Sequence, residues 1–275
     1  MIMTEIKSIG TTLDMDSDGF FISPCCSSNI NESWQEVIDS TIAAYRYFLK
    51  EQLVSVYVRG SLVRGTAVPG VSDIDTFAVV NASRWQLDLS WIEQAQIRLA
   101  QKCSFNTSVE MQVMTLSELK DPKNLEPLGF TLKVLSSCVW GEDVSQTLPK
   151  FGLGNYLLKD LVELEESLET VLDKVMSLED EDELVLVCQW IMKVLVRSGY
   201  CLVIPQERTF TRDLYPSYMG FKKHYPEQAE RMALALQLAI KPSRDKATII
   251  DTLTGLGQWI VTESKCSQPN LEIET

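Results

Sequence analysis

The chain has 275 residues, of which 45% are hydrophobic and 23% charged, and its formal net charge is −13. This composition is typical of a globular protein, and the length allows one large domain or two ordinary ones. The negative charge argues against a nucleic-acid partner, because binding to a phosphate backbone depends on Lys and Arg. The same charge either attracts a cationic small substrate or serves solubility.

The sequence also argues against a membrane partner. No apolar run approaches the length of a membrane span, and the first residues lack the basic start and apolar core of a signal peptide. The seven cysteines are scattered and include no C-x-x-C pair. We therefore expect reduced thiols and a cytoplasmic location.

The N-terminal half alternates between helical and strand patterns. Apolar residues at three- and four-residue spacing predict a helix over about 34–53, and a β-branched run predicts a buried strand over 54–58. A short helix is expected over 62–67. Beyond it we predict a strand over 75–80, a helix over 85–102, a strand over 108–115, and a helix or strand over 129–140.

The C-terminal half is helical throughout. A stripe of leucines and valines over 157–175 predicts an amphipathic helix, and a second apolar helix is expected over 184–198 with Gly199 as its cap. Strands mixed with helices, followed by helices alone, predict an α+β fold with two domains. The remaining predicted helices are 215–224, 227–240 and 246–263, and the predicted domains are 1–150 and 151–275.

The most informative motif lies where the first predicted strand ends and the second begins. Gly60 and Ser61 end the first strand, and Asp73 and Asp75 open the second. Side chains at i and i+2 of a strand share a face, and two such carboxylates repel unless a cation lies between them. Mg²⁺ is usually held by one or two carboxylates together with substrate phosphates. The motif therefore predicts metal-assisted chemistry on a nucleotide.

This motif, followed by Glu110 on a later predicted strand, resembles that of the polymerase-β-like nucleotidyltransferase superfamily. The resemblance covers about 55–116. It implies a nucleotidyltransferase core with a small mixed sheet flanked by helices, ATP as co-substrate and two Mg²⁺ ions. It also implies that Asp73, Asp75 and Glu110 are catalytic residues and metal ligands.

Each residue of the motif has a physical role in this interpretation. Gly60 lets the backbone approach the triphosphate, and Ser61 with the following N–H groups bonds phosphate oxygens. Glu110 either binds a second Mg²⁺ or accepts the proton of the attacking hydroxyl, as a carboxylate ionised at neutral pH can. Arg64, one turn past Ser61, either contacts a phosphate or is a solvated surface residue.

The C-terminal half resembles the helical domain of aminoglycoside adenylyltransferases of the streptomycin/spectinomycin type. In that match Arg197 ends a helix and Arg212 follows in a basic turn, so both would bind the triphosphate across the domain cleft. Arg212 stands where a Lys is usual in the family, and the connecting segment is longer. The alternative is that both are surface arginines at helix ends.

The acidic segment 160–183 and Trp190 each allow two interpretations, and the histidine content excludes some catalytic mechanisms. Eleven acids and only Lys174 as a base lie within 160–183, which is either a solvated face or an acidic wall that pairs with a polyamine-like substrate. Trp190 is either a core residue or a platform for the substrate. Because His224 is the only histidine, His-based metal sites and Ser-His-Asp catalysis are excluded, and Ser61 is a phosphate contact.

The predicted function is Mg²⁺-dependent transfer of AMP from ATP to a hydroxyl of a small acceptor, cationic or aminoglycoside-like, with release of pyrophosphate. One alternative is a protein adenylyltransferase of the antitoxin type. Another is a non-catalytic module that binds a nucleotide and regulates a partner. The presence of the Gly-Ser pair and of all three acids argues against the second alternative.

Overall fold

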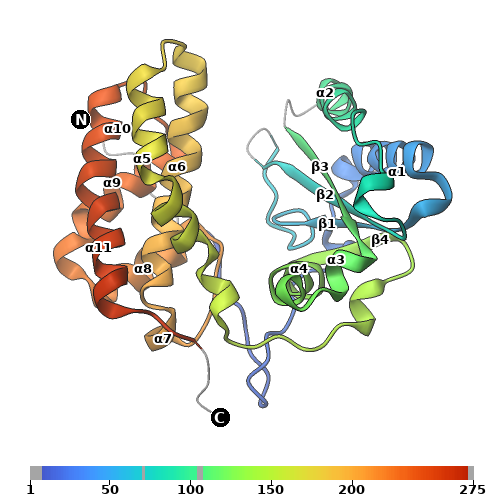
Figure 1. Cartoon of the computed structure of the whole chain (residues 1–275), viewed down its shortest axis with the longest axis horizontal. Helices are drawn as coiled ribbons and strands as arrows, with labels where there is room; N and C mark the ends of the chain where they lie inside the picture. Colours follow the sequence, from blue (N-terminus) through green and yellow to red (C-terminus); the bar gives the residue numbers. More distant parts are fainter. Residues whose placement is uncertain (1–7, 70–71, 104–107, 272–275) are drawn as a thin grey trace. The chain divides into compact units, whose positions relative to one another are not determined.

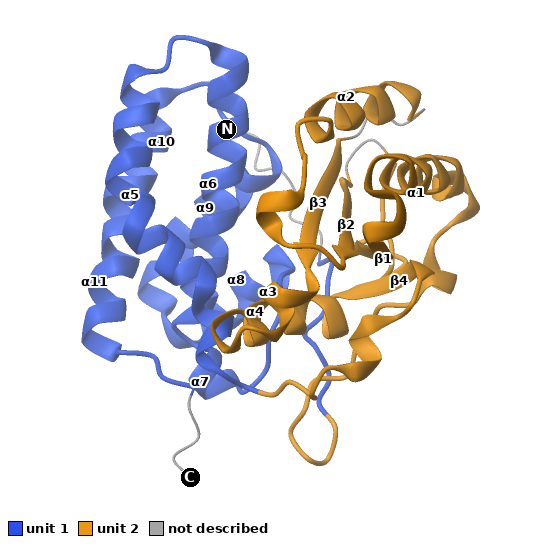
Figure 2. Cartoon of the chain, turned by 45° about the vertical axis from the view of Figure 1, so that its right-hand side comes forward, with its two compact units in different colours: residues 1–15, 153–275 blue, residues 16–152 orange. Residues whose placement is uncertain are grey.

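The computed structural model describes residues 8–69, 72–103 and 108–271, and these fall into two compact units (Figure 2). One unit is Asp16–Gly152, and the other combines Met1–Met15 with Leu153–Thr275. The predicted first domain began at residue 1, whereas in the structure residues 8–15 belong to the helical unit. The reason is a backbone hydrogen bond to the helical unit, in which the Leu13 N–H donates to the Phe210 carbonyl at 2.7 Å.

The unit Asp16–Gly152 is built on a four-stranded sheet with the order β3-β2-β1-β4 (Figure 1). β2 runs antiparallel to β1 and parallel to β3, and β4 runs antiparallel to β1. This mixed sheet confirms the predicted α+β core. The strands are β1 Leu53–Arg59, β2 Ile74–Val80, β3 Val109–Thr115 and β4 Ser136–Gly141.

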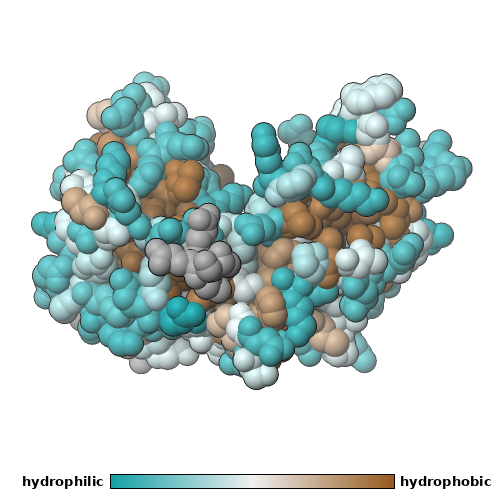
Figure 3. Space-filling view, turned by 60° about the horizontal axis from the view of Figure 1, so that its bottom comes forward, coloured by the Kyte–Doolittle hydropathy of each residue, from teal (hydrophilic) through white to brown (hydrophobic). Residues whose placement is uncertain are grey.

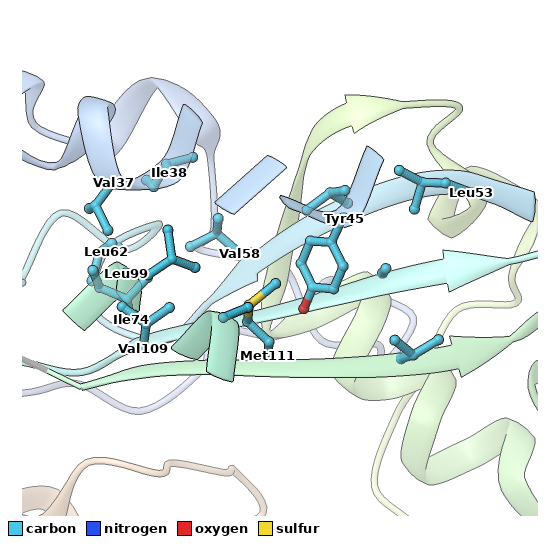
Figure 4. Packing of buried hydrophobic residues seen from close by; sticks show 14 of the residues in the cluster. Val37, Ile38, Tyr45, Leu53, Val58, Leu62, Ile74, Leu99, Val109 and Met111 are labelled. Atoms are coloured by element: carbon cyan, nitrogen blue, oxygen red, sulfur yellow. The ribbon is translucent and has the colours of Figure 1, made fainter. Parts of the chain in front are cut away.

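Helices cover the two faces of this sheet differently. One face packs against α1 (Gln35–Leu49) and α2 (Ile92–Lys102) in a large apolar cluster. The other face packs against α3 (Leu116–Lys120) and α4 (Pro122–Val134) in a smaller cluster. In Figure 4 the side chain of Tyr45 stands among the apolar residues of the large cluster, with its hydroxyl directed at the strands. Short 3₁₀ helices complete the unit at Ser27–Asn29, Glu32–Trp34, Lys50–Gln52, Arg84–Gln86 and Val144–Thr147.

Successive residues of each strand point to opposite faces, which decides where polar side chains can stand. In β2, Ile74, Thr76 and Ala78 point toward α1 and α2. Asp75 and Phe77 point to the face that α3 and α4 cover only in part. Charged side chains can therefore stand on the uncovered part of that face, where they keep contact with water.

The other unit is all-helical, as predicted. Its long helices α5 (Lys159–Ser177) and α6 (Glu181–Cys201) pack against each other. By length and composition alone α6 could cross a membrane, but 67% of its most apolar window is buried, as in the central helix of a bundle. The remaining elements are the 3₁₀ helices Asn155–Leu158 and Pro226–Gln228, α7 Ile204–Glu207, α8 Leu214–His224, α9 Ala229–Ile240, α10 Lys246–Thr252, a π-helical turn Leu253–Gly257 and α11 Gln258–Ser267.

Two predicted helix features were wrong. Residues 62–67 form consecutive turns and an extended stretch instead of a helix, because Gly65 adopts a left-handed φ of 71°. Gly199 does not cap α6, which continues to Cys201. A Cβ on Gly199 would lie 2.3 Å from Met232 Cε, so this glycine permits close packing inside the bundle.

Hydrophilic residues cover most of the face of the molecule shown in Figure 3, and apolar side chains reach that surface only in patches. This agrees with a chain that has 38 acidic and 25 basic residues. The charged groups relevant to catalysis are those that neighbouring strands of the sheet bring close together.

Candidate active site

Two of the predicted catalytic acids are neighbours on parallel strands. Asp75 is the second residue of β2 and Glu110 the second residue of β3, and the two are direct partners in the register. Their side chains share the partly covered face of the sheet, with exposed fractions of 27% and 51%. The backbone therefore holds two carboxylates side by side at an accessible edge of the domain.

A buried hydroxyl network fixes this register from the opposite face. The Thr76 hydroxyl donates to the Glu110 carbonyl at 2.9 Å, and it lies 3.1 Å from the hydroxyl of Tyr45. The Tyr45 oxygen also accepts the Gln112 N–H at 3.0 Å. Through Tyr45, helix α1 thus holds β2 and β3 in register next to Asp75 and Glu110. This network could not be predicted from the sequence, because Tyr45 has the spacing of an apolar residue on the buried face of a helix.

Asp73 stands apart from the register pair. It lies just before β2, is exposed, and accepts a hydrogen bond of 2.7 Å from the Ser108 hydroxyl. Its charge is still near enough to contribute to the raised pKa of Glu110. Over residues 8–69, 72–103 and 108–271, no group of three His, Cys, Asp or Glu side chains is close enough to hold a metal by itself. The predicted triad is thus not a preformed cage, since Asp73 lies outside the strand ladder that aligns the other two.

The two register partners nevertheless fit Mg²⁺ chemically. They offer hard carboxylate oxygens on one exposed face, and Mg²⁺ usually keeps several waters and is completed by substrate phosphates rather than by an all-protein cage. The structure already shows a cation at this place, because the guanidinium of Arg59 contacts both carboxylates.

Arg59 is the site residue that the sequence analysis missed. It ends β1 opposite Asp75. Its Nε lies 3.5 Å from Asp75 Oδ2, and its Nη2 lies 3.9 Å from Glu110 Oε2. The available signal was an arginine directly before Gly60, but its partners depend on how β1 pairs with β2.

The surroundings of Glu110 shift its acidity. Partial burial is the largest cause of its raised pKa, followed by the charge and hydrogen bond of Asp75. Arg59 opposes this shift, and Asp73 adds to it. The raised pKa of Glu110 thus reflects its partial burial and the crowding of carboxylates at this place.

Gly60 and Ser61 form a tight turn beside the acids. Gly60 has a left-handed φ of 80°, and a Cβ built on it would lie 3.4 Å from Asp75 Oδ2. The turn closes with the Thr66 N–H donating to the Ser61 carbonyl at 2.9 Å. The Nε of Arg64 donates to the Gly60 carbonyl at 3.4 Å, which brings this arginine back over the turn. These three predicted nucleotide contacts thus gather next to Asp75.

A cavity of about 290 Å³ continues the same face of the sheet. Phe77 and Gln112 line it, and each lies two residues along its strand from Asp75 or Glu110. Its outer wall carries an ion pair of 2.9 Å between Arg84 and Glu118. The remaining lining residues are Val113, Met114, Asn124 and Leu128. The cavity offers polar and apolar contacts beside the acids.

The two predicted arginines of the helical unit lie together. The Arg197 Nε donates to the Arg212 carbonyl at 3.2 Å. Arg212 donates through both terminal nitrogens to the carboxylate of Asp160, at 3.0 and 3.4 Å. Asp160 is 6% exposed, so this ion pair is part of the structure of the unit. Trp190, on α6 seven residues before Arg197, is 42% exposed and so is not a fully buried core residue.

Comparison with known proteins agrees with this geometry. Residues 43–126 match the family model described as a nucleotidyltransferase domain. No curated protein matches the chain. Among solved structures, the spectinomycin adenyltransferase AAD(9) from Enterococcus faecialis, solved with ATP and spectinomycin, is similar with a TM-score of 0.52. The two share 16% identity over 82% of this chain and 98% of that one.

The matched residues, 43–126, contain the Gly-Ser turn, Asp73, Asp75 and Glu110. The fold likeness extends beyond them over most of the chain. Residues 43–126 are therefore similar to a nucleotidyltransferase domain, and the fold of the chain is similar to that of AAD(9).

Proposed function

We propose that the enzyme transfers AMP from ATP to a hydroxyl of a small acceptor and releases pyrophosphate. The observation that carries this proposal is the register of Asp75 and Glu110 beside the Gly60 turn, inside a nucleotidyltransferase domain. Two adjacent carboxylates next to a turn that admits a phosphate are what metal-dependent nucleotidyl transfer needs.

Residues of the turn bind the triphosphate in this proposal. The absence of a side chain on Gly60 lets phosphate oxygens approach the backbone, and the Ser61 hydroxyl donates to one of them. Arg64, held over the turn by its bond to the Gly60 carbonyl, supplies a positive charge to the same group. Arg197 and Arg212 remain proposed triphosphate contacts of the helical unit, although Arg212 is shared with Asp160.

Asp75 and Glu110 would hold Mg²⁺, with Asp73 as a further ligand. When bound by these residues, Mg²⁺ would supply the positive charge that offsets the negative charge of the phosphates. Glu110 accepts the proton from the acceptor hydroxyl, which forms a bond to the α-phosphorus while the bond to pyrophosphate breaks. Most of the rate enhancement comes from holding hydroxyl, phosphorus and leaving group in line.

The acceptor is proposed to be a cationic amino-hydroxy compound, such as an aminoglycoside antibiotic, in which case the enzyme confers resistance to it. Three observations support this class. AAD(9), similar in fold, was solved with spectinomycin. The chain carries a net charge of −13, with eleven acids within 160–183. Trp190 exposes an indole on α6 that can cover an apolar ring face of a sugar.

A thermal-shift screen tests the proposal. The protein is heated with ATP–Mg²⁺ and a panel of aminoglycosides and other amino-hydroxy compounds, and each compound that adds stabilisation is then incubated with the enzyme. We expect at least one compound to gain the mass of one adenylyl group. Adenylylation of a protein partner alone would replace the small-acceptor proposal by the protein-modifying one. Binding of ATP–Mg²⁺ without transfer to any acceptor would favour a regulatory module.

A further inference from the structure

Arg59 contacts Asp75 and Glu110, the two acids proposed to hold the metal, so its side chain lies where the metal is proposed to bind. Arg59 is paired through its backbone on both sides, to Asp75 in β2 and to Ser136 in β4. Its backbone position is therefore fixed, and only its side chain can move. That side chain is 35% exposed, so it has room to leave the acids without any change in the sheet.

The geometry of the contact is that of a weak ion pair. The distances of 3.5 Å to Asp75 and 3.9 Å to Glu110 are longer than those of a charge-assisted hydrogen bond. Exposed pairs of this kind contribute little and are easily exchanged. The guanidinium offsets one of the two negative charges, but these long contacts do not hold the carboxylates in place.

Arg59 lies on the side of the Asp75 carboxylate that faces the Gly60 turn. Asp75 Oδ2 is 3.5 Å from Arg59 Nε and would be 3.4 Å from a Cβ built on Gly60. In the proposed function the triphosphate approaches at Gly60, so a metal held by Asp75 on that side would meet the guanidinium. Arg59 and the metal cannot both occupy this position.

We propose that Arg59 is a displaceable internal cation of the active site. In the metal-free enzyme it offsets part of the negative charge of Asp75 and Glu110. When Mg²⁺ and the nucleoside triphosphate bind, the guanidinium leaves these carboxylates and pairs with the triphosphate, which lies next to it because Arg59 directly precedes Gly60. This inference rests on the proposed role of Asp75 and Glu110 as metal ligands.

The proposal makes opposite predictions for the metal alone and for the metal with nucleotide. Without nucleotide, Arg59 competes with the metal for the carboxylates, so Arg59→Met should tighten the binding of the metal. With nucleotide present, Arg59 contributes a phosphate contact, so the same substitution should weaken the binding of the nucleotide. A purely structural arginine would not produce effects of opposite sign.

The test measures Mn²⁺ binding by the electron paramagnetic resonance signal of the free ion, first alone and then with a non-hydrolysable ATP analogue. We expect Arg59→Met to lower the Kd for Mn²⁺ alone by on the order of two- to fivefold and to raise the Kd for the analogue by a similar factor. Arg59→Lys, which keeps the charge, should lie between Arg59→Met and the wild type in both measurements.

Arg84→Met is the matched control. It removes the same charge from the same unit, but Arg84 pairs with Glu118 and contacts neither Asp75 nor Glu110 in the structure. The expected changes are those that remain after the effect of this control is subtracted. Near-UV circular dichroism establishes that each variant is folded.

Asp75→Asn separates failure of this inference from failure of the proposed function. If Asp75→Asn loses Mn²⁺ binding while Arg59→Met leaves either Kd unchanged, the metal assignment stands and the role of Arg59 is overturned. If Asp75→Asn binds Mn²⁺ like the wild type, the metal assignment itself is overturned.

Discussion

Asp75 and Glu110 are direct register partners on the parallel strands β2 and β3, and their carboxylates share one exposed face of the sheet. A shift of one residue in this pairing would send one of the two acids to the opposite face, into the cluster beneath α1 and α2. The function of the site therefore depends on interactions that hold the register, and these lie on the buried side.

Tyr45→Phe tests that dependence. The substitution removes a buried hydroxyl that contacts Thr76 and Gln112, and it leaves their polar groups without this partner. We expect a loss of about 1–3 kcal/mol in the free energy of unfolding, measured in urea, together with lower turnover. Tyr47→Phe is the control, because Tyr47 lies on the same helix and is 73% exposed. Equal stability of Tyr45→Phe and the control would contradict the role of this network.

Glu110→Gln separates binding from chemistry. The amide cannot accept a proton, so turnover should fall by about 10²–10⁴-fold. The amide oxygen of the variant can still coordinate Mg²⁺ beside Asp75, so part of the stabilisation by ATP–Mg²⁺ in a thermal-shift assay should remain. Normal turnover of this variant would show that Glu110 is neither the base nor an essential metal ligand.

Gly60→Ala tests the turn next to the acids. Among the described residues, a Cβ at this position meets only Asp75 Oδ2, at an ordinary contact distance of 3.4 Å, so the cost comes from the left-handed φ of 80°. We expect a loss of about 1 kcal/mol in stability, with a larger relative loss of nucleotide affinity. Gly255→Ala is the control, since a Cβ there meets no atom within 4 Å and no left-handed φ is involved.

Arg212→Met examines the ion pair of the helical unit. It would leave the buried carboxylate of Asp160 without its arginine, and we expect a loss of about 3 kcal/mol in the free energy of unfolding. The double variant Asp160→Asn with Arg212→Met should recover part of that loss, because the uncompensated charge is gone. A stability equal to that of the wild type in Arg212→Met would contradict a stabilising role for this ion pair.

Acid stability of the helical unit should depend on Glu207. Its carboxylate accepts from Lys223 at 2.7 Å and contacts His224 at 2.6 Å, and the bond from Lys223 is the main cause of its lowered pKa. A lowered pKa in the folded state stabilises the fold above the pKa of the unfolded chain, and this contribution is lost as the pH falls through the folded value. Thermal unfolding from about pH 6 to about pH 3 should therefore show a smaller drop in Tm for Glu207→Gln than for the wild type.

Much of the fold could be predicted from local patterns. Short β-branched runs indicated the three strands that carry the site, and apolar stripes indicated the long helices of the second unit. The predicted ends of helices were less accurate where polar side chains hydrogen-bond to backbone groups and so compete with helix formation. The helix expected over 85–102 begins only at Ile92, because the Asp88 carboxylate accepts the Ser90 N–H and holds the preceding residues in a turn.

The site was predictable only as far as residues adjacent in the sequence define it. The spacing of Gly60, Asp73 and Asp75 is local, and Glu110 followed from the family resemblance. The contacts of Arg59 and Tyr45 depend on strand register and on packing between distant segments, which no local pattern reveals. The loss of the expected helix after Ser61 depends on the left-handed backbone of Gly65, which the sequence only allows.

The central claim is that Asp75 and Glu110 form a metal-dependent centre for nucleotidyl transfer. Its most direct test is transfer of label from ATP carrying ³²P at the α-phosphate to an acceptor found in the thermal-shift screen, with and without Mg²⁺. We predict labelled acceptor only with the wild type and Mg²⁺, and none above background with Asp75→Asn. Label transfer by Asp75→Asn at the rate of the wild type would contradict the claim.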